Sequence, residues 1–376
     1  MIVNRKTYNK KVKLIEKYSQ LILLSIFQYA RILDVISCRI DPRQFIVLPV
    51  NKWLKLTTTA LRIILLFSYC WDVVPFLYND LKETPRSFQH MFSLQQILSV
   101  AVFSIALLFL RERDELKIIT MINRFIKLNN RLSELTCSNI LVRKKFIIFT
   151  SLKGCITILG YINELPTLLN VESLNLNRWF ITVIGVFMWL GSMFVLDSCY
   201  LGFLIIGLMY DNLGSYLQII MKNLLNIEKS DSLSSALTSY HRITLVCDYS
   251  DKLDIISKIY SRLYTTTKEF IAIFQWHILY YIYYNFMVIF LLLNHFIWQY
   301  MQSGYIDIIE ILMVMVKIGN LTLIIVCANY VVEQSEMPNR SNIDVICSDV
   351  DVRWDASVSN FQYNLTNADL LITQSE

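Results

Sequence analysis

Two polar residues, Lys317 and Asn320, lie inside an apolar run of residues 313–332 that is long enough to cross a membrane. A lysine at the centre of a bilayer costs about 2.5–3.5 kcal/mol on insertion scales, so such residues usually face the protein interior or a water-filled cavity. A carboxylate at the same depth would serve as a partner, and Asp72 matches best in depth, with Glu164 second. The sequence therefore predicts a buried Lys317–Asp72 ion pair.

Aromatic and amide side chains are predicted at a similar depth in neighbouring apolar runs, and they are Tyr161, Trp189, Tyr284 and Asn285. Aromatic walls with a few polar groups describe a pocket for a small molecule. The alternative is a structural ion pair with aromatic filling, and the residues alone do not separate the two. Asp197 lies deeper, in the inner half of its run, and is set aside as a partner of Lys317. The candidate ligand-binding residues are Asp72, Tyr161, Glu164, Trp189, Tyr284, Asn285, Lys317 and Asn320.

Patterns for catalysis and for metal or cofactor binding are absent from the sequence. It has no GxSxG elbow, Walker loop, HExxH pair or dinucleotide fingerprint. Its four histidines are scattered and its eight cysteines form no CxxC pair, so neither a zinc site nor a disulfide framework is indicated. Carboxylates do not pair at a spacing that suits acid–base catalysis. We therefore expect no enzyme activity, no cofactor, no metal and no nucleic-acid partner.

Membrane-spanning helices must position these polar residues. Hydrophobic residues make up 55% of the 376-residue chain, its mean hydropathy is +0.45, and 17% of its residues are charged, against about 25% in soluble domains. A ~30 Å hydrocarbon core needs about 20 apolar residues in a helix. Six runs are long enough: 57–78, 92–110, 146–167, 179–209, 268–296 and 308–331. We predict an all-α, polytopic helical membrane protein with six spans.

Lysine and arginine counts predict how the spans are oriented. Residues 1–56 hold eleven, residues 111–145 hold nine and residues 210–268 hold seven, whereas the alternate loops hold few or none. Basic loops stay on the cytoplasmic side of a membrane, so we expect a cytoplasmic N-terminus. Six spans then place the tail after residue 331 on the same side. The run of residues 18–37 is predicted to be an amphipathic or re-entrant helix at the inner face.

Three regions are predicted along the chain: a cytoplasmic N-terminal segment over 1–56, a transmembrane domain over 57–331 and a cytoplasmic tail over 332–376. Within the transmembrane domain, apolar residues spaced three and four apart predict that spans four and five continue into the cytoplasm as helices over 210–267. No Pro-, Gly- or Ser-rich linker divides these regions.

Four segments of the sequence resemble insect gustatory receptors. They are "RILDVISCRIDPRQFIV", "LDIISKIYSRLYTTTKEFIAIFQWHILYYIYYNFMVI", "KIGNLTLIIVCANYVVEQSE" and "CSDVDVRWDASVSNFQ". Each motif alone is weak, but together they cover nearly the whole chain. The resemblance implies a taste receptor with seven spans that assembles as a homo- or hetero-tetrameric, ligand-gated cation channel in the plasma membrane of a sensory neuron. It also implies a pocket for a small-molecule tastant in the outer half of spans one to six, and an ordered segment around Trp354 packed on the cytoplasmic helices.

One departure concerns the end of the chain. Family members end with a seventh span that carries a TYxxxxxQF-like motif and lines the shared pore, and residues 332–376 hold no apolar run of that length. We therefore expect a chain that lacks the last span, and a truncated, non-conducting receptor chain is one alternative function. A G-protein-coupled receptor and a transporter are further alternatives, although the expected cytoplasmic N-terminus argues against the former.

Overall fold

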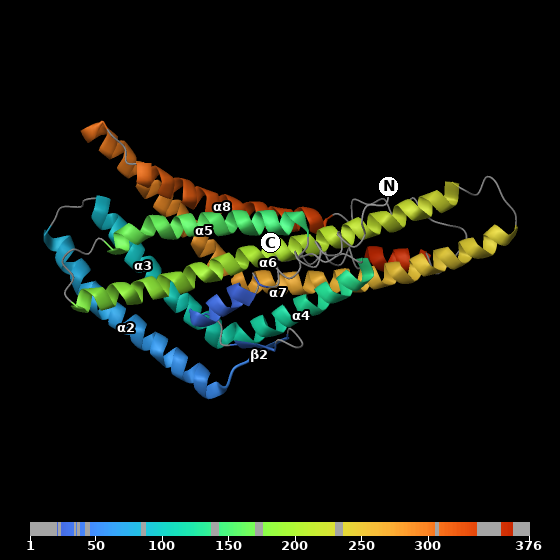
Figure 1. Ribbon diagram of the computed structural model, residues 1–376, viewed down its shortest axis with the longest axis horizontal. Helices are drawn as coiled ribbons and strands as arrows, with labels where there is room; N and C mark the ends of the chain where they lie inside the picture. The colour runs from blue at the N-terminus through green and yellow to red at the C-terminus, as the bar shows by residue number, and fades with distance from the viewer. Residues whose placement is uncertain are drawn as a thin grey trace. The chain divides into compact units, whose positions relative to one another are not determined.

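Long helices form most of the structure, which is a computed structural model (Figure 1). It describes residues 21, 24–33, 35, 38–41, 46–83, 88–136, 143–169, 176–229, 236–304, 308–336 and 355–363. The helices are α2 (Lys52–Glu83), α3 (Phe88–Phe109), the π turn η1 (Leu110–Asp114), α4 (Glu115–Thr136), α5 (Lys144–Leu169), α6 (Leu176–Lys229), α7 (Ala236–Ser303) and α8 (Ile308–Ser335). Two further stretches, 24–32 and 355–363, are also helical. The all-α prediction is confirmed.

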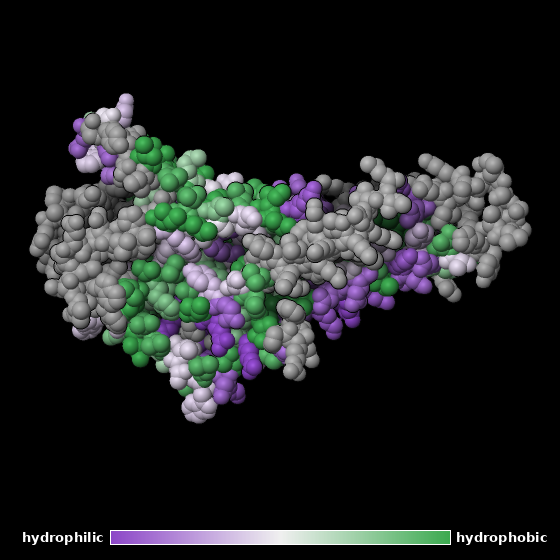
Figure 2. Space-filling model, viewed as in Figure 1, coloured by the Kyte–Doolittle hydropathy of each residue, from purple (hydrophilic) through white to green (hydrophobic). Residues whose placement is uncertain are grey.

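Five helices within the described residues are long and apolar enough to cross a membrane. These candidate spans are Lys52–Trp71, Lys144–Ile162, Val183–Leu224, Ile243–Gln302 and Ile311–Ser335. The predicted run of residues 92–110 lies in α3, apart from its last residue, and α3 is not among the five. The face shown in Figure 2 has hydrophobic side chains over α5 and α8. Exposed apolar residues of these two helices include Ile158 and Met315. Exposed apolar helix faces of this kind suit a multi-pass membrane protein, whose solvent is lipid.

The chain forms two compact units. The first unit comprises Met1–Asn123, Lys144–Gly202 and Ile271–Val326, and the second comprises Arg124–Arg143, Phe203–Phe270 and Cys327–Glu376. The helices α6 and α7 have 54 and 68 residues, so at 1.5 Å per residue they are ~80 and ~100 Å long, well beyond a bilayer's thickness. Residues 210–229 and 236–267 are helical, as their apolar spacing predicts.

A two-stranded antiparallel hairpin was not predicted. Strand β1 (Cys38–Asp41) pairs with β2 (Ile46–Pro49), with Cys38 opposite Pro49. On α4, the Asn123 side chain accepts a hydrogen bond from the Val47 N–H and donates one to the Val47 carbonyl, both at 2.8 Å. One amide thus takes the place of a third strand, and this contact between distant segments is why sequence patterns did not reveal the hairpin.

The N-terminal helix ends inside the first unit. The Val35 N–H donates to the Ala30 carbonyl at 3.0 Å, a six-residue closure typical of helix C-termini. In the same turn, the buried Leu33 carbonyl accepts a hydrogen bond of 3.2 Å from Nη1 of Arg62 on α2. A cation suits this end because helix carbonyls carry partial negative charge. Gly191 makes room for Arg62, since an added Cβ would lie 2.7 Å from its Nη2.

The helix of residues 355–363 packs on α7 within the second unit. Phe361 is fully buried and its ring contacts the Tyr260 ring at 6.3 Å. The Ser357 and Ser250 hydroxyls lie 2.8 Å apart and share a hydrogen bond. This arrangement agrees with the ordered segment expected near Trp354, although Trp354 itself lies outside the described residues.

Candidate functional site

Lys153, on α5, lies at the centre of a group of polar side chains in the first unit. Its side chain is 8% exposed, and its Nζ lies 2.8 Å from Oδ1 of Asp197 on α6. The same ammonium donates a hydrogen bond of 2.6 Å to Oδ1 of Asn320 on α8. One charged group therefore joins three helices, α5, α6 and α8.

Close helix packing brings Lys153 within reach of α8. An added Cβ at Gly319 would lie 3.3 Å from Cδ1 of Ile156, and one at Gly160 would lie 3.4 Å from Cγ1 of Val316. These glycines let the α5 and α8 backbones approach closely, as small residues do between membrane helices. Hence the short Asn320 side chain spans the remaining distance.

Tyr200 completes the surroundings of the ammonium. It follows Asp197 by three residues, which puts both side chains on one face of α6. Its ring centre lies 5.6 Å from the Lys153 Nζ, within the range of a cation–π contact. The Tyr200 hydroxyl donates to the Phe149 carbonyl at 3.0 Å, which fixes the ring. Lys153 is thus held by a carboxylate, an amide and an aromatic face.

A second polar group lies between α7 and α8. The Nζ of Lys317 is 5.7 Å from the Tyr284 ring centre, and Tyr284 is 2% exposed. Asn285 is equally buried and its amide donates to the Tyr281 carbonyl at 2.9 Å. Tyr281 lies within electrostatic range of both Asp197 and Lys317.

An aromatic pair adds to this arrangement in the first unit. The Tyr161 ring on α5 and the Trp189 ring on α6 meet edge to face, with centres 5.7 Å apart and an angle of 72°. Edge-to-face pairs are favourable beyond their buried area. The structure therefore brings together Tyr161 and Trp189, two residues that the sequence placed at a similar depth.

Two predicted residues lie outside what the structure describes. Asp72 and Glu164 are on helical backbone in α2 and α5, but their side chains are not among those described. The Lys317–Asp72 ion pair therefore stays a prediction. Asn320 has a described partner that the sequence did not suggest, because its Oδ1 accepts a hydrogen bond from the Lys153 ammonium.

Lys153 and Asp197 were not in the predicted set. Asp197 was set aside because its depth did not suit Lys317, and Lys153 was overlooked near the basic start of its run. The structure corrects this, because the two are each other's partners. Ionisable residues within membrane spans usually face the protein interior. This rule, which led to Lys317, indicates Lys153 equally.

The charged, amide and aromatic groups of this arrangement are of the kinds that recognise a small molecule. A buried ion pair is costly to desolvate and is kept only where hydrogen bonds satisfy its remaining groups, as Asn320 does for Lys153. Among the described residues, no three His, Cys, Asp or Glu side chains gather as metal ligands would. Charged, amide and aromatic groups at membrane depth can orient a polar small molecule. We call Tyr161, Lys153, Trp189, Asp197, Tyr200, Tyr281, Tyr284, Asn285, Lys317 and Asn320 the polar–aromatic cluster.

Two comparisons with known proteins gave matches over most of the chain. Residues 23–373 match the family described as 7tm Chemosensory receptor. The chain is also 32% identical over 352 residues to a protein of Drosophila melanogaster named "Gustatory receptor for bitter taste 93a". That alignment covers 92% of this chain and 83% of the fly protein.

Proposed function

This chain belongs to the 7tm chemosensory receptor family as an insect gustatory receptor, and from that premise we propose that it is a subunit of a cation channel gated by a small molecule. Family membership makes it a taste chemoreceptor. The proposed gating ligand binds at the polar–aromatic cluster, and its binding opens the channel.

The observation that carries this proposal is the three-helix junction at Lys153. Its contacts with Asp197 at 2.8 Å and Asn320 at 2.6 Å tie α5 to α6 and α8. A ligand that competes for either contact would change how these helices are held, and a ligand shifts an equilibrium only through such differential contacts. Aromatic faces at Tyr161 and Trp189 would bind its apolar part.

The fly relative is named for bitter taste, so we propose bitter-tasting small molecules as the ligand class to test first. The proposed setting is the plasma membrane of a sensory neuron, in a homo- or hetero-tetramer with other gustatory receptor subunits. Membrane lipid surrounds the exposed apolar faces of the helices.

Recordings from cells that express the full chain, alone and with other gustatory receptor subunits, would test the proposal. A panel of bitter-tasting small molecules is applied while calcium entry and current are measured. We expect a response that Lys153→Met weakens by about tenfold or more, because the contacts of the ammonium with Asp197 and Asn320 are both lost, a free energy of about 1.4 kcal/mol or more.

The matched control is Leu152→Ala, which changes the neighbouring residue, 45% exposed on the outer side of α5. It should respond like the wild-type chain at equal surface abundance. Responses that Lys153→Met leaves unchanged would contradict the proposed site, and the absence of any response in all subunit combinations would contradict the channel.

A further inference from the structure

A π turn interrupts the long helix that begins with α3. Residues Leu110–Asp114 form η1, and helical dihedral angles flank it, with φ −62° and ψ −45° at Phe109 and φ −53° and ψ −47° at Glu115. The three elements α3, η1 and α4 therefore form one continuous helix. A π turn accommodates one residue more than the α-helix and often marks a functional position.

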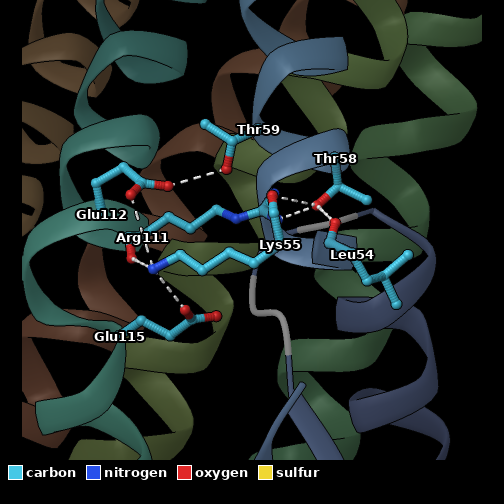
Figure 3. A network of polar contacts seen from close by, with 7 residues as sticks. All are labelled: Leu54, Lys55, Thr58, Thr59, Arg111, Glu112 and Glu115. Carbon is cyan, nitrogen blue, oxygen red and sulfur yellow. Dashed lines mark hydrogen bonds and ion pairs between the residues drawn. The ribbon is translucent and has the colours of Figure 1, made fainter. Parts of the chain in front are cut away.

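Arg111 ties this π turn to the first turn of α2 (Figure 3). It is 1% exposed. Its Nη2 donates to the Lys55 carbonyl at 3.3 Å and to the Thr58 hydroxyl. Burying a guanidinium is costly unless its donors are satisfied, so the π turn is stable where α2 supplies these acceptors.

The Lys55 side chain, on α2, contacts η1 and the first residue of α4. Its Nζ lies 2.9 Å from Oε2 of Glu115, which is 5% exposed, and it donates to the Arg111 carbonyl at 3.2 Å. A π turn disturbs the regular i→i−4 ladder, and side chains can satisfy the carbonyls that it affects. On the same side, Thr59 donates to Oε1 of Glu112 at 2.9 Å.

We propose that η1 is a register switch, and that Lys55 and Thr58 on α2 are the latch that holds it in the π form. When the latch opens, the extra residue joins the regular α-helix. The residues of α4 that follow then advance by one helical position, a turn of about 100° and a shift of about 1.5 Å relative to α3. The device thus has two discrete arrangements instead of a flexible joint.

The exposure pattern of α4 makes this shift measurable. Ile119 is 4% exposed and Met121 is 3% exposed, whereas Thr120 between them is exposed. After a one-residue advance, Ile119 takes the exposed position of Thr120, and Thr120 takes the buried position of Met121. A register shift therefore exchanges the two exposures, and local unfolding would instead expose both residues.

The experiment uses two single-cysteine additions in the full chain, Ile119→Cys and Thr120→Cys, in membranes from expressing cells. N-ethylmaleimide labelling at each position is read by peptide mass spectrometry, so the chain's own cysteines stay in place. With the latch intact, we expect Thr120→Cys to label faster than Ile119→Cys by about tenfold or more. With Lys55→Met and Thr58→Val added, we expect that order to reverse.

Deleting Arg113, an exposed residue of the π turn, gives a second and independent variant. Without the extra residue, α3 and α4 join as a plain α-helix in their native register. The deletion should therefore restore the original labelling order in the chain that carries Lys55→Met and Thr58→Val. The proposal is wrong if opening the latch leaves the order unchanged, if both cysteines become reactive together, or if the deletion does not restore the order.

Discussion

At the scale of single residues, the buried charges decide where chemistry can occur. The sequence correctly indicated that an intramembrane lysine lies on a protein-facing surface, since Lys317 contacts the buried Tyr284. It did not indicate the partnership of Lys153 with Asp197, because helix depth along the chain does not reveal which helices are neighbours. The close packing of α5 against α8 depends on Gly160 and Gly319.

The Lys153–Asp197 contact should behave as a coupled pair. Lys153→Met leaves the partly buried Asp197 carboxylate without its cation, and Asp197→Asn leaves the buried Lys153 ammonium without its carboxylate. Each should lower the free energy of unfolding, by up to about 3–5 kcal/mol. The double variant should recover part of the loss, with a coupling of about 0.5–3 kcal/mol. Chemical denaturation of the purified receptor in detergent measures all three values. Strictly additive losses would show that the two residues act independently.

The thiol of Cys38, on β1, should be unreactive in the folded chain. Burial raises the pKa of Cys38 from 9.0 to about 12, and the Glu115 carboxylate adds to this, while Arg31 lowers it. Because the unfolded chain loses this proton above its lower pKa and the folded chain keeps it, stability should fall between about pH 9 and pH 12.

Maleimide labelling of Cys38 at pH 8 checks this expectation. The native thiol should label about tenfold or more slowly than the same thiol in denaturant. Equal rates for Cys38 in both states would contradict its buried, protonated state.

At the scale of elements, apolar runs predicted the helices, because each run of about 20 apolar residues must satisfy its own backbone. The hairpin and η1 were missed for the same physical reason. Each depends on side chains from another element: Asn123 holds β2, and Lys55 and Thr58 hold η1. Local patterns carry no signal for contacts of this kind.

Gly191 on α6 should not tolerate a methyl group. Gly191→Ala would place its Cβ 2.7 Å from Nη2 of Arg62, which must then leave the Leu33 carbonyl or distort the packing. Such overpacking costs about 1–3 kcal/mol. The matched control is Gly154→Ala on α5, where an added Cβ meets nothing within 4 Å and the gain in helix propensity is about 1 kcal/mol. The melting temperature should therefore fall for Gly191→Ala and rise for Gly154→Ala. A shift in the same direction for both variants would contradict the crowding at Gly191.

At the scale of the whole molecule, the two units have different characters. The first unit holds the polar–aromatic cluster, and the second unit holds the helix of residues 355–363 against α7. The sequence indicated both the membrane character and the ordered tail segment, because composition and family resemblance act over long stretches. It could not show the division into units, which follows from contacts alone.

Phe361 should anchor the tail helix in the second unit. Phe361→Ala removes a fully buried ring that contacts Tyr260, a change that costs about 3–5 kcal/mol in protein cores. Hydrogen exchange across residues 355–363 should then approach that of a free peptide. Tyr363→Ala, at a position 67% exposed, is the control and should leave exchange slow. Slow exchange in the Phe361→Ala variant would show that the anchor lies elsewhere.

The single amide of Asn123 that stands in for a strand has a consequence for natural sequence variation. It contacts only the backbone of residue 47, once as acceptor and once as donor. Position 123 therefore tolerates only a side chain that can both donate and accept a hydrogen bond at this distance from the backbone of residue 47. Asp, Leu and Ser should all be eliminated in a saturation mutagenesis library. Residue 47 takes part through its backbone N–H and carbonyl. Its side chain should therefore vary among residues that fit the buried space. Selection should therefore constrain the side chain at position 123 strongly and the side chain at position 47 only weakly.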